Sequence, residues 1–302
     1  MHIAKDRLSI AFHVGAHKTA TSHLQRSLRA ASDALADQGV MYYGPDHFRL
    51  PGRSLPALFG QKATQKRAPA DQLDLLRKGG HRLIISEENF MGVLNSPRRR
   101  PVKMRYPEAG RRVADIATAV DVGGLDVFLS IRNPATFLNS AYCQMLLGGR
   151  VMPFAKFARI NPIESVNWHS LAKRLSRARG VNRVVVWRFE DYAPLFPRIC
   201  TALAGPDAGG LIAPLARRIH VGLSATAVAE VLMQDGTGAD DRVANRARKA
   251  HPVSADTPPF DGFDTHIHGL ADAAYSGQIA AIRALPKVTF LDPAVTPDTV
   301  RS

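Results

Sequence analysis

The segment 12–25, FHVGAHKTATSHLQ, constrains the fold more than any other part of this 302-residue chain. The apolar run at residues 8–14 predicts a buried first strand, and apolar residues at helical spacing over 24–35 predict a helix. Between them lie one glycine, one lysine and three hydroxyl residues. Such a turn at a helix N-terminus offers backbone N–H groups, a positive dipole end and a cation to an anion. The segment therefore predicts a nucleotide-phosphate site.

This turn differs from the phosphate loop of ATP-hydrolysing enzymes. Their pattern is GxxxxGK[ST], with a glycine directly before the lysine and a hydroxyl that holds magnesium. Here His17 precedes Lys18, and the next candidate strand, residues 125–131, continues into Arg132 with no acidic residue to hold the metal. These differences disfavour an ATPase, although a kinase that uses ATP stays an alternative.

The turn resembles the 5′-phosphosulfate loop of sulfotransferases, the enzymes that use 3′-phosphoadenosine-5′-phosphosulfate (PAPS). Bacterial members carry a loop similar to HxGxxKTGTT, and this chain has Ala20 in place of the usual glycine between the threonines. Because alanine adopts a positive φ far less readily than glycine, we expect the loop to do without one there. The resemblance implies that Lys18 is also catalytic and that PAPS is bound by Gly15, His17, Lys18, Thr19, Ala20, Thr21 and Ser22.

A second motif lies at the end of the predicted strand over 125–131. Sulfotransferases bind the 3′-phosphate with an arginine at a strand end and a serine eight residues later, and Arg132 and Ser140 have that spacing. A guanidinium group can bind phosphate with two hydrogen bonds, and a serine on the next helix can complete the site. Pro134 favours a helix start here because it has no N–H to leave unpaired. The resemblance thus implies a 3′-phosphate site at Arg132 and Ser140.

An acidic pair follows the short apolar run at residues 83–85. We expect this run to be a buried strand, with Glu87 and Glu88 beyond its carboxyl end, where open parallel sheets bind ligands. Related bacterial sequences are similar to SxENxxG here, and the resemblance implies that Glu88 is the general base. The pair also fits a helix cap beside a solvated carboxylate. Because adjacent side chains on a strand point to opposite faces, we expect only one of the two to face the crevice, and Glu87 stays the alternative base.

Strands and helices alternate along the rest of the chain. Residues 183–187 predict a buried strand followed by RFEDY, similar to the WRYEDY of bacterial relatives, and a helix over 267–285 and a strand over 288–291 come last. The alternation predicts an α/β fold in one domain over residues 1–302, a parallel sheet with helices on both faces, which the resemblance makes sulfotransferase-like. We expect a loop or lid over 235–262 and a flexible C-terminal tail.

Composition and charge indicate where the protein works and which partners it binds. No apolar run approaches the roughly 20 residues of a membrane span, and the two cysteines, Cys143 and Cys200, lie far apart and without zinc-ligand spacing. We therefore expect a cytoplasmic protein with no metal site. The formal net charge is +14, and basic residues gather at 62–67 and 98–112, where they would concentrate an anionic ligand. Nucleic acid is disfavoured as a partner because no interleaved aromatic run and no recognisable DNA-binding module is present.

The resemblance implies transfer of a sulfuryl group from PAPS to a hydroxyl or amine of a saccharide, a lipid or a small metabolite, anionic acceptors included. No metal is needed, because preorganised cations stabilise the charge that develops in such reactions. The family often adds a basic loop at the 3′-phosphate, for which Arg217 or Arg218 is a candidate without a clear motif. Besides the ATP-dependent kinase, a non-catalytic polyanion-binding protein stays open, and its binding would weaken steeply with salt.

Overall fold

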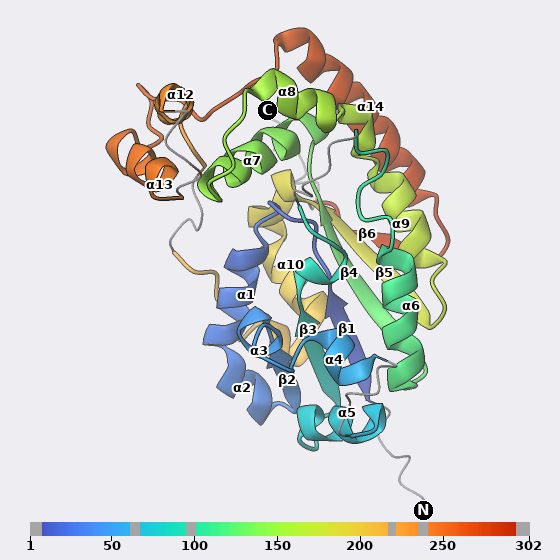
Figure 1. The fold of residues 1–302 in the computed structure, drawn as a ribbon. Coiled ribbons are helices and arrows are strands. Elements are labelled where there is room, and N and C mark those ends of the chain that lie inside the picture. The colour runs from blue at the N-terminus through green and yellow to red at the C-terminus, as the bar shows by residue number, and fades with distance from the viewer. Residues whose placement is uncertain (1–7, 61–66, 95–100, 217–221, 235–240, 294–302) are drawn as a thin grey trace, which may run out of the picture.

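The protein is built on one parallel β-sheet (Figure 1). The computed structural model describes residues 8–60, 67–94, 101–216, 222–234 and 241–293. Within these ranges the sheet has six strands in the order β2-β3-β1-β4-β5-β6, and every neighbouring pair is parallel. The strands are β1 (Ser9–His13), β2 (Val40–Tyr43), β3 (Arg82–Ser86), β4 (Leu125–Ile131), β5 (Val181–Arg188) and β6 (Val288–Phe290). The predicted α/β fold is confirmed.

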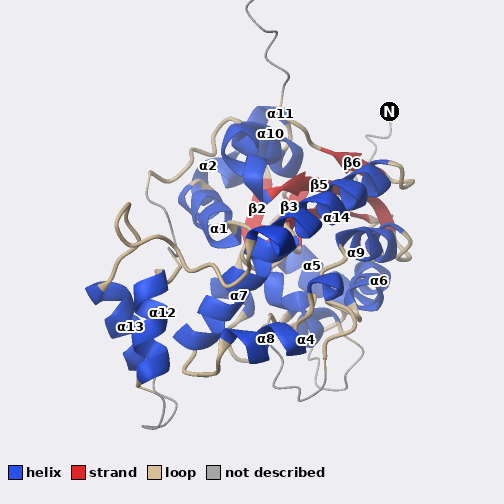
Figure 2. Cartoon of the chain, turned by 90° about the horizontal axis from the view of Figure 1, so that it is seen from above, coloured by secondary structure: helices blue, strands red, loops and turns tan. Residues whose placement is uncertain are grey.

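Helices cover both faces of the sheet, and the view from above shows the strands between two helical layers (Figure 2). One layer consists of α1 (Thr21–Ala30), α2 (Ser32–Asp37), α10 (Tyr192–Ala204) and α11 (Pro206–Gly209). The other layer and the helices above it comprise α3 (Pro45–Phe48), α4 (Leu55–Phe59), α5 (Pro69–Arg77), α6 (Ala109–Val120), α7 (Pro134–Leu147), α8 (Phe154–Ile160), α9 (Trp168–Ser176), α12 (Ala225–Met233), α13 (Asp241–Ala250) and α14 (Thr265–Arg283). The described residues also form the 3₁₀ turns η1 (Glu88–Phe90), η2 (Ile163–Ser165) and η3 (Phe189–Asp191).

The strands are buried on both faces, so their side chains divide between two cores. Ile10 and Phe12 of β1 belong to the core beneath α6 and α9, whereas Ala11 faces α1 and α10. Residues 125–131 alternate in the same way along β4. A parallel sheet covered by helices on both sides favours such continuous apolar runs. This is why the central strands are recognisable from sequence.

The strand order reverses beside β1, which lies between β3 and β4. From β1 the chain passes to β2 and β3 on one side, and it then crosses over to β4 on the other. Ligands of open parallel sheets bind at such a reversal, just outside the carboxyl ends of the strands. The loops that follow β1, β3 and β4 therefore converge at one edge of the sheet.

Some expectations for the periphery need correction. The segment 235–262 is not a continuous loop, because Asp241–Ala250 forms α13, which packs beside α12 and α7. Residues 235–240, the expected tail over 294–302 and the candidates Arg217 and Arg218 lie outside the described residues. Cys143 and Cys200 are both buried and free. None of the described helices is long and apolar enough to cross a membrane.

Candidate functional site

The loop between β1 and α1 leaves a row of backbone N–H groups unpaired. Its first part is tied to β4, since the N–H groups of Val14 and Gly15 donate to the carbonyl of Phe128 at 3.1 and 3.3 Å. The N–H of His17 donates to the Tyr106 hydroxyl. In the described part of the chain, the five N–H groups of residues 18–22 have no hydrogen-bond partner. They lie at the N-terminus of α1, where the helix dipole also favours an anion.

Two residues of this loop adopt a left-handed backbone conformation despite their side chains. Ala20 has φ +62° and Lys18 has φ +65°. The expectation that the loop does without a positive φ at Ala20 is therefore wrong. The left-handed region costs an L-residue with a Cβ about 1–2 kcal/mol, so the contacts around the loop have to outweigh that cost. A side chain at Gly15 would be strained, because φ is +40° and its Cβ would lie 3.0 Å from Nε2 of His13, which would have to shift.

The hydroxyl residues of the loop differ in what they bind. The side-chain hydroxyls of Thr19 and Thr21 both donate to the carbonyl of Ala16, at 2.6 and 3.3 Å. Ser22 lies half-buried in the first turn of α1, and its hydroxyl has no hydrogen-bond partner among the described residues. The threonine hydroxyls therefore shape the loop, while the unpaired backbone N–H groups and the Ser22 hydroxyl stay available to a ligand.

Lys18 and Arg132 bring two cations to this loop. The Lys18 ammonium donates to Oε1 of Gln144 on α7, at 3.1 Å, and Nη1 of Arg132 donates to the Lys18 carbonyl at 2.9 Å. Burial, together with the Arg132 charge, lowers the pKa of Lys18. In the described part of the chain neither cation has a carboxylate within ion-pair distance, although the Glu190 charge acts on Arg132, and the two neighbouring cations repel each other. A bound anion would relieve this repulsion.

Arg132 is fixed from several directions. Its Nε donates to the Thr136 hydroxyl at 3.0 Å, and its guanidinium stacks over the Phe189 ring at 4.4 Å. Asn133 caps α7, which begins at Pro134 as predicted. Ser140 lies half-buried on α7, one turn before Gln144, so the two share a helix face. The structure thus places Arg132 beside the loop and Ser140 on the helix that contacts Lys18.

The acidic pair at the end of β3 converges on a residue that the sequence did not indicate. Arg49, directly after α3, donates from Nε and Nη2 to the two carboxylate oxygens of Glu87, at 3.1 and 2.8 Å. The same Nη2 lies 2.9 Å from Oε1 of Glu88. The expectation that the two carboxylates face opposite directions is therefore wrong. The strand ends at Ser86 and Glu88 begins η1, so the alternation of an extended strand no longer applies.

The two carboxylates nevertheless have different surroundings. Glu87 is buried, and its side chain caps η1 by accepting a hydrogen bond from the N–H of Asn89. Glu88 accepts one hydrogen bond from Gln25 on α1, at 2.8 Å, besides the one from Arg49. Burial acts to raise the pKa of Glu88, but the hydrogen bond from Gln25 and the nearby Arg49 outweigh it, and the pKa is lowered. Glu88 is therefore ionised at neutral pH.

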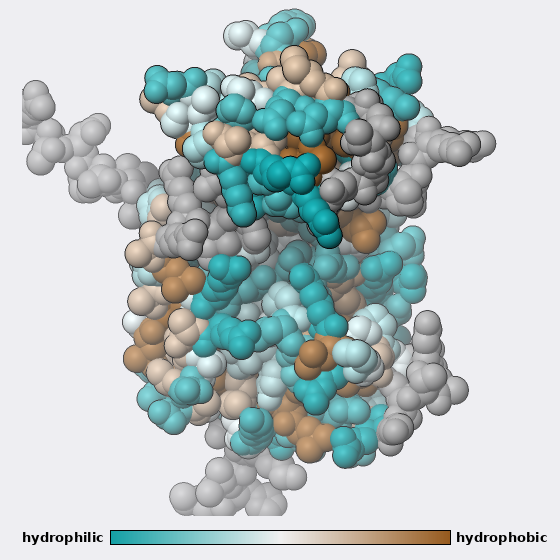
Figure 3. Space-filling view, turned by 60° about the vertical axis from the view of Figure 1, so that its left-hand side comes forward, coloured by the Kyte–Doolittle hydropathy of each residue, from teal (hydrophilic) through white to brown (hydrophobic). Residues whose placement is uncertain are grey.

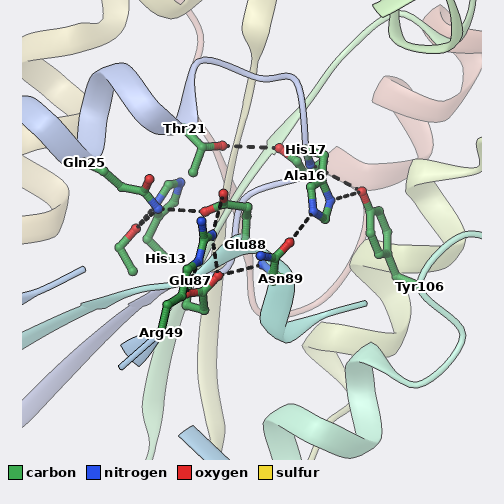
Figure 4. A network of polar contacts seen from close by, with 11 residues as sticks. His13, Ala16, His17, Thr21, Gln25, Arg49, Glu87, Glu88, Asn89 and Tyr106 are labelled. Atoms are coloured by element: carbon green, nitrogen blue, oxygen red, sulfur yellow. Dashed lines mark hydrogen bonds and ion pairs between the residues drawn. The ribbon is translucent and has the colours of Figure 1, made fainter. Parts of the chain in front are cut away.

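A continuous polar network joins this strand end to the loop between β1 and α1 (Figure 4). Nε2 of His17 lies 2.9 Å from Oδ1 of Asn89, and its Nδ1 lies 2.8 Å from the Tyr106 hydroxyl. With Asn89 accepting, Nε2 carries the proton and Nδ1 accepts from Tyr106. Burial lowers the pKa of His17, so the ring is neutral. His17 thus clamps the loop, and both of its ring nitrogens are occupied.

The described basic residues expected to concentrate anions are mostly engaged elsewhere. Arg105 is buried and donates to the Leu94 carbonyl and to Asn161, and Arg112 donates to the Phe90 carbonyl. Residues 62–66 and 98–100 of the same patch lie outside the described residues. Among the described residues, no three His, Cys, Asp or Glu side chains come together in an arrangement that could hold a metal ion.

Among known proteins, similarity to this chain is found in solved structures. No family model and no curated protein sequence matches the chain. The chain is similar to a sulfotransferase from Alicyclobacillus acidocaldarius, with a TM-score of 0.41 and 17% identity, over 72% of this chain and 87% of that one. It is also similar to retinol dehydratase in complex with androsterone and the inactive cofactor PAP, with a TM-score of 0.34 and 10% identity, over 92% of this chain and 82% of that one.

Proposed function

We propose that this protein is a sulfotransferase that uses PAPS and modifies a hydroxyl or amine of a saccharide, a lipid or a small metabolite. The observation that carries the proposal is the row of five N–H groups over residues 18–22 that have no hydrogen-bond partner among the described residues, with Lys18 and Arg132 beside it. Helix N-termini of this kind bind phosphate and sulfate groups. The loop sequence adds the resemblance to the sulfotransferase 5′-phosphosulfate loop.

In this proposal each side of the nucleotide has its own residues. The N–H groups of residues 18–22, with Lys18 and the Ser22 hydroxyl, hold the 5′-phosphosulfate, and Arg132 with Ser140 holds the 3′-phosphate. Gly15, His17, Thr19, Ala20 and Thr21 give the loop its shape. PAPS supplies the activated sulfuryl group, and its S–O bond to the phosphate breaks as a bond from sulfur to the acceptor atom forms. Lys18 stabilises the negative charge that develops on the departing phosphate oxygen.

Glu88 takes the proton that the acceptor loses. The lowered pKa keeps its carboxylate ionised at neutral pH, and the hydrogen bonds from Gln25, Arg49 and its own backbone N–H leave part of its acceptor capacity free. As a general base it has to come within about 3 Å of the acceptor oxygen or nitrogen in the bound state. Glu87 is the alternative base. Arg49 donates to both of its carboxylate oxygens, however, and the N–H of Asn89 donates to one of the same oxygens.

The proposal is tested by two substitutions at the cations. Lys18→Ala and Arg132→Ala each remove a charged donor to phosphate, worth about 1.5–3 kcal/mol. We therefore expect each variant to bind 3′-phosphoadenosine-5′-phosphate at least about tenfold more weakly in a calorimetric titration. Lys156→Ala, at an exposed position on α8, is the matched control and should bind like the wild type. Unchanged affinity in both site variants would show that the nucleotide site is elsewhere.

A further inference from the structure

A cavity of about 380 Å³ lies between α6 and α9, outside the polar network at the strand ends. Basic side chains dominate its lining, with a serine and the first turn of α6 beside them. The residues that matter here are Gly110, Arg111, Ser170, Lys173, Arg174 and Arg177. A cavity of this size can hold a small organic molecule.

The positive charge of this cavity is only partly neutralised. Arg111 pairs with Glu108 at 2.7 Å and with Asp115 at 3.0 Å, so its charge is already compensated. Lys173 and Arg177 have no carboxylate within ion-pair distance in the described part of the chain. They lie four residues apart, so both project from the same face of α9 and its C-terminal end. Two uncompensated cations therefore share one wall.

Arg174 adds a third cation, which is half-buried against backbone carbonyls and also interacts with the charge of Glu108. Its guanidinium donates to the backbone carbonyls of Arg105, Tyr106 and Pro107, at 2.5 to 3.1 Å. Its Nε is buried and has no hydrogen-bond partner among the described residues. Burial lowers the pKa of this guanidinium. A cation that is desolvated against carbonyls gains free energy when an anion approaches it.

We propose that this cavity binds a small molecule that carries a sulfate or phosphate ester. Guanidinium groups match the oxygens of such esters with paired hydrogen bonds, and a lysine adds a point charge. The N-terminus of α6, at Ala109, directs its positive dipole end to the same region. The volume exceeds what a bare tetrahedral anion needs and leaves room for a body of about the size of a sugar. The site is separate from the nucleotide loop and does not depend on the function proposed above.

The test uses a Lys18→Ala, Arg132→Ala background, in which the nucleotide loop can no longer supply cations. A hexose 6-phosphate, a hexose 6-sulfate and inorganic phosphate are each titrated by calorimetry. We expect at least one of the two esters to bind more tightly than inorganic phosphate, and the tighter ester identifies the group that the cavity recognises. Adding Lys173→Gln and Arg177→Gln should weaken that binding at least about tenfold.

Lys156→Gln with Arg159→Gln is the matched control. It removes the same two charges from exposed positions on α8 and should leave ester binding unchanged. An equal loss in both double variants would mean that net charge alone attracts the esters, and the proposal would be wrong. The same conclusion follows if the background protein binds no ester, or if inorganic phosphate binds as tightly as both esters. An error in the proposed nucleotide site would be detected separately, by the titrations of the Lys18 and Arg132 variants with 3′-phosphoadenosine-5′-phosphate.

Discussion

Arg49 organises the acidic pair at the end of β3. It engages both oxygens of Glu87 and one oxygen of Glu88, while Gln25 holds the other oxygen of Glu88. The hydrogen bonds of Glu87 therefore hold the end of β3 and the turn that follows it. Glu88, which is bound by Gln25, Arg49 and its own backbone N–H, keeps acceptor capacity on its carboxylate. The difference in their surroundings favours Glu88 as the group that meets the acceptor.

Substitution by glutamine separates these two roles. Glu88→Gln keeps the size of the side chain but removes the basic carboxylate, so sulfuryl transfer should fall about 10²–10⁴-fold while nucleotide affinity persists. Glu87→Gln breaks a buried charged pair and should lower the free energy of unfolding by about 1–3 kcal/mol. Turnover of labelled PAPS with an acceptor extract and urea unfolding measure the two effects. Activity lost only in Glu87→Gln, at unchanged stability, would reverse the assignment.

His13 makes the stability of the fold sensitive to mild acid. Its ring is buried beneath the loop, with Nδ1 2.8 Å from the Ser86 hydroxyl. Burial, opposed in part by Glu88, lowers the pKa from 6.5 to about 4. Because the folded state disfavours the charged ring, the part of the folding stability that needs a neutral His13 is complete above pH 6.5. As the pH falls toward 4, the unfolded chain binds the proton first and this contribution is lost, up to about 3 kcal/mol.

The variant His13→Asn tests this pH dependence. Asparagine can keep the hydrogen bond to Ser86 but does not titrate, so its free energy of unfolding should depend less on pH between 6.5 and 4 than that of the wild type. Urea unfolding at a series of pH values measures both slopes. Equal slopes in the two proteins would mean that His13 is not desolvated as the structure indicates.

At the scale of elements, the loop between β1 and α1 keeps two residues with a Cβ in the left-handed conformation. Contacts from three directions hold it there: β4 binds its first N–H groups, Tyr106 and Asn89 hold His17, and Arg132 binds the Lys18 carbonyl. The loop therefore presents its free N–H groups in a fixed arrangement before any ligand binds. Such preorganisation lowers the entropic cost of binding.

Ala20→Gly should relieve the strain of this loop. Glycine adopts φ +62° without the steric cost of a Cβ, although it gains more freedom in the unfolded chain. We expect a net gain of about 1 kcal/mol in the free energy of unfolding, measured with urea. Ala274→Gly, at an exposed position inside α14, is the control and should lose about 1 kcal/mol. A loss at Ala20 as well would mean that its φ is not positive in the folded protein.

The elements themselves differ in how well the sequence predicts them. The strands β1, β3, β4 and β5 are predictable because burial on both faces leaves continuous apolar runs. The strand β2 was missed because it is a short edge strand, with three of its four residues only half-buried. The helix α13 was missed because its packing face consists of Val243, Ala244 and Ala247 within a highly charged segment.

The candidate site is predictable only where its residues are close in sequence. The loop over 15–22, the Arg132–Ser140 spacing and the acidic pair all follow strand ends, so the fold rule for parallel sheets brings them together. The Arg49–Glu87 pair, the Lys18–Gln144 contact and the His17–Tyr106 contact span 38 to 126 residues. No local pattern marks such partners, because packing of distant elements determines them.

At the scale of the whole molecule, the sheet topology gathers the charged groups of the site at one edge. The loops after β1 and β4 supply Lys18 and Arg132, and the end of β3 supplies Glu88. The face on the side of α1 and α13 carries mainly hydrophilic side chains (Figure 3). With a formal net charge of +14, the molecule as a whole also attracts anionic ligands. Net charge alone does not distinguish one nucleotide from another, whereas the geometry at the strand ends can.

The most direct measurement is therefore a calorimetric comparison of two nucleotides with the wild-type protein. We expect 3′-phosphoadenosine-5′-phosphate to bind at one site per chain without magnesium. We expect ATP to bind at least about tenfold more weakly, because it lacks the 3′-phosphate for Arg132. The affinity for 3′-phosphoadenosine-5′-phosphate should persist at moderate salt. Tighter binding of ATP in the presence of magnesium would contradict the account and indicate a kinase. Binding of both nucleotides that disappears alike with salt would indicate a protein that binds polyanions without catalysis.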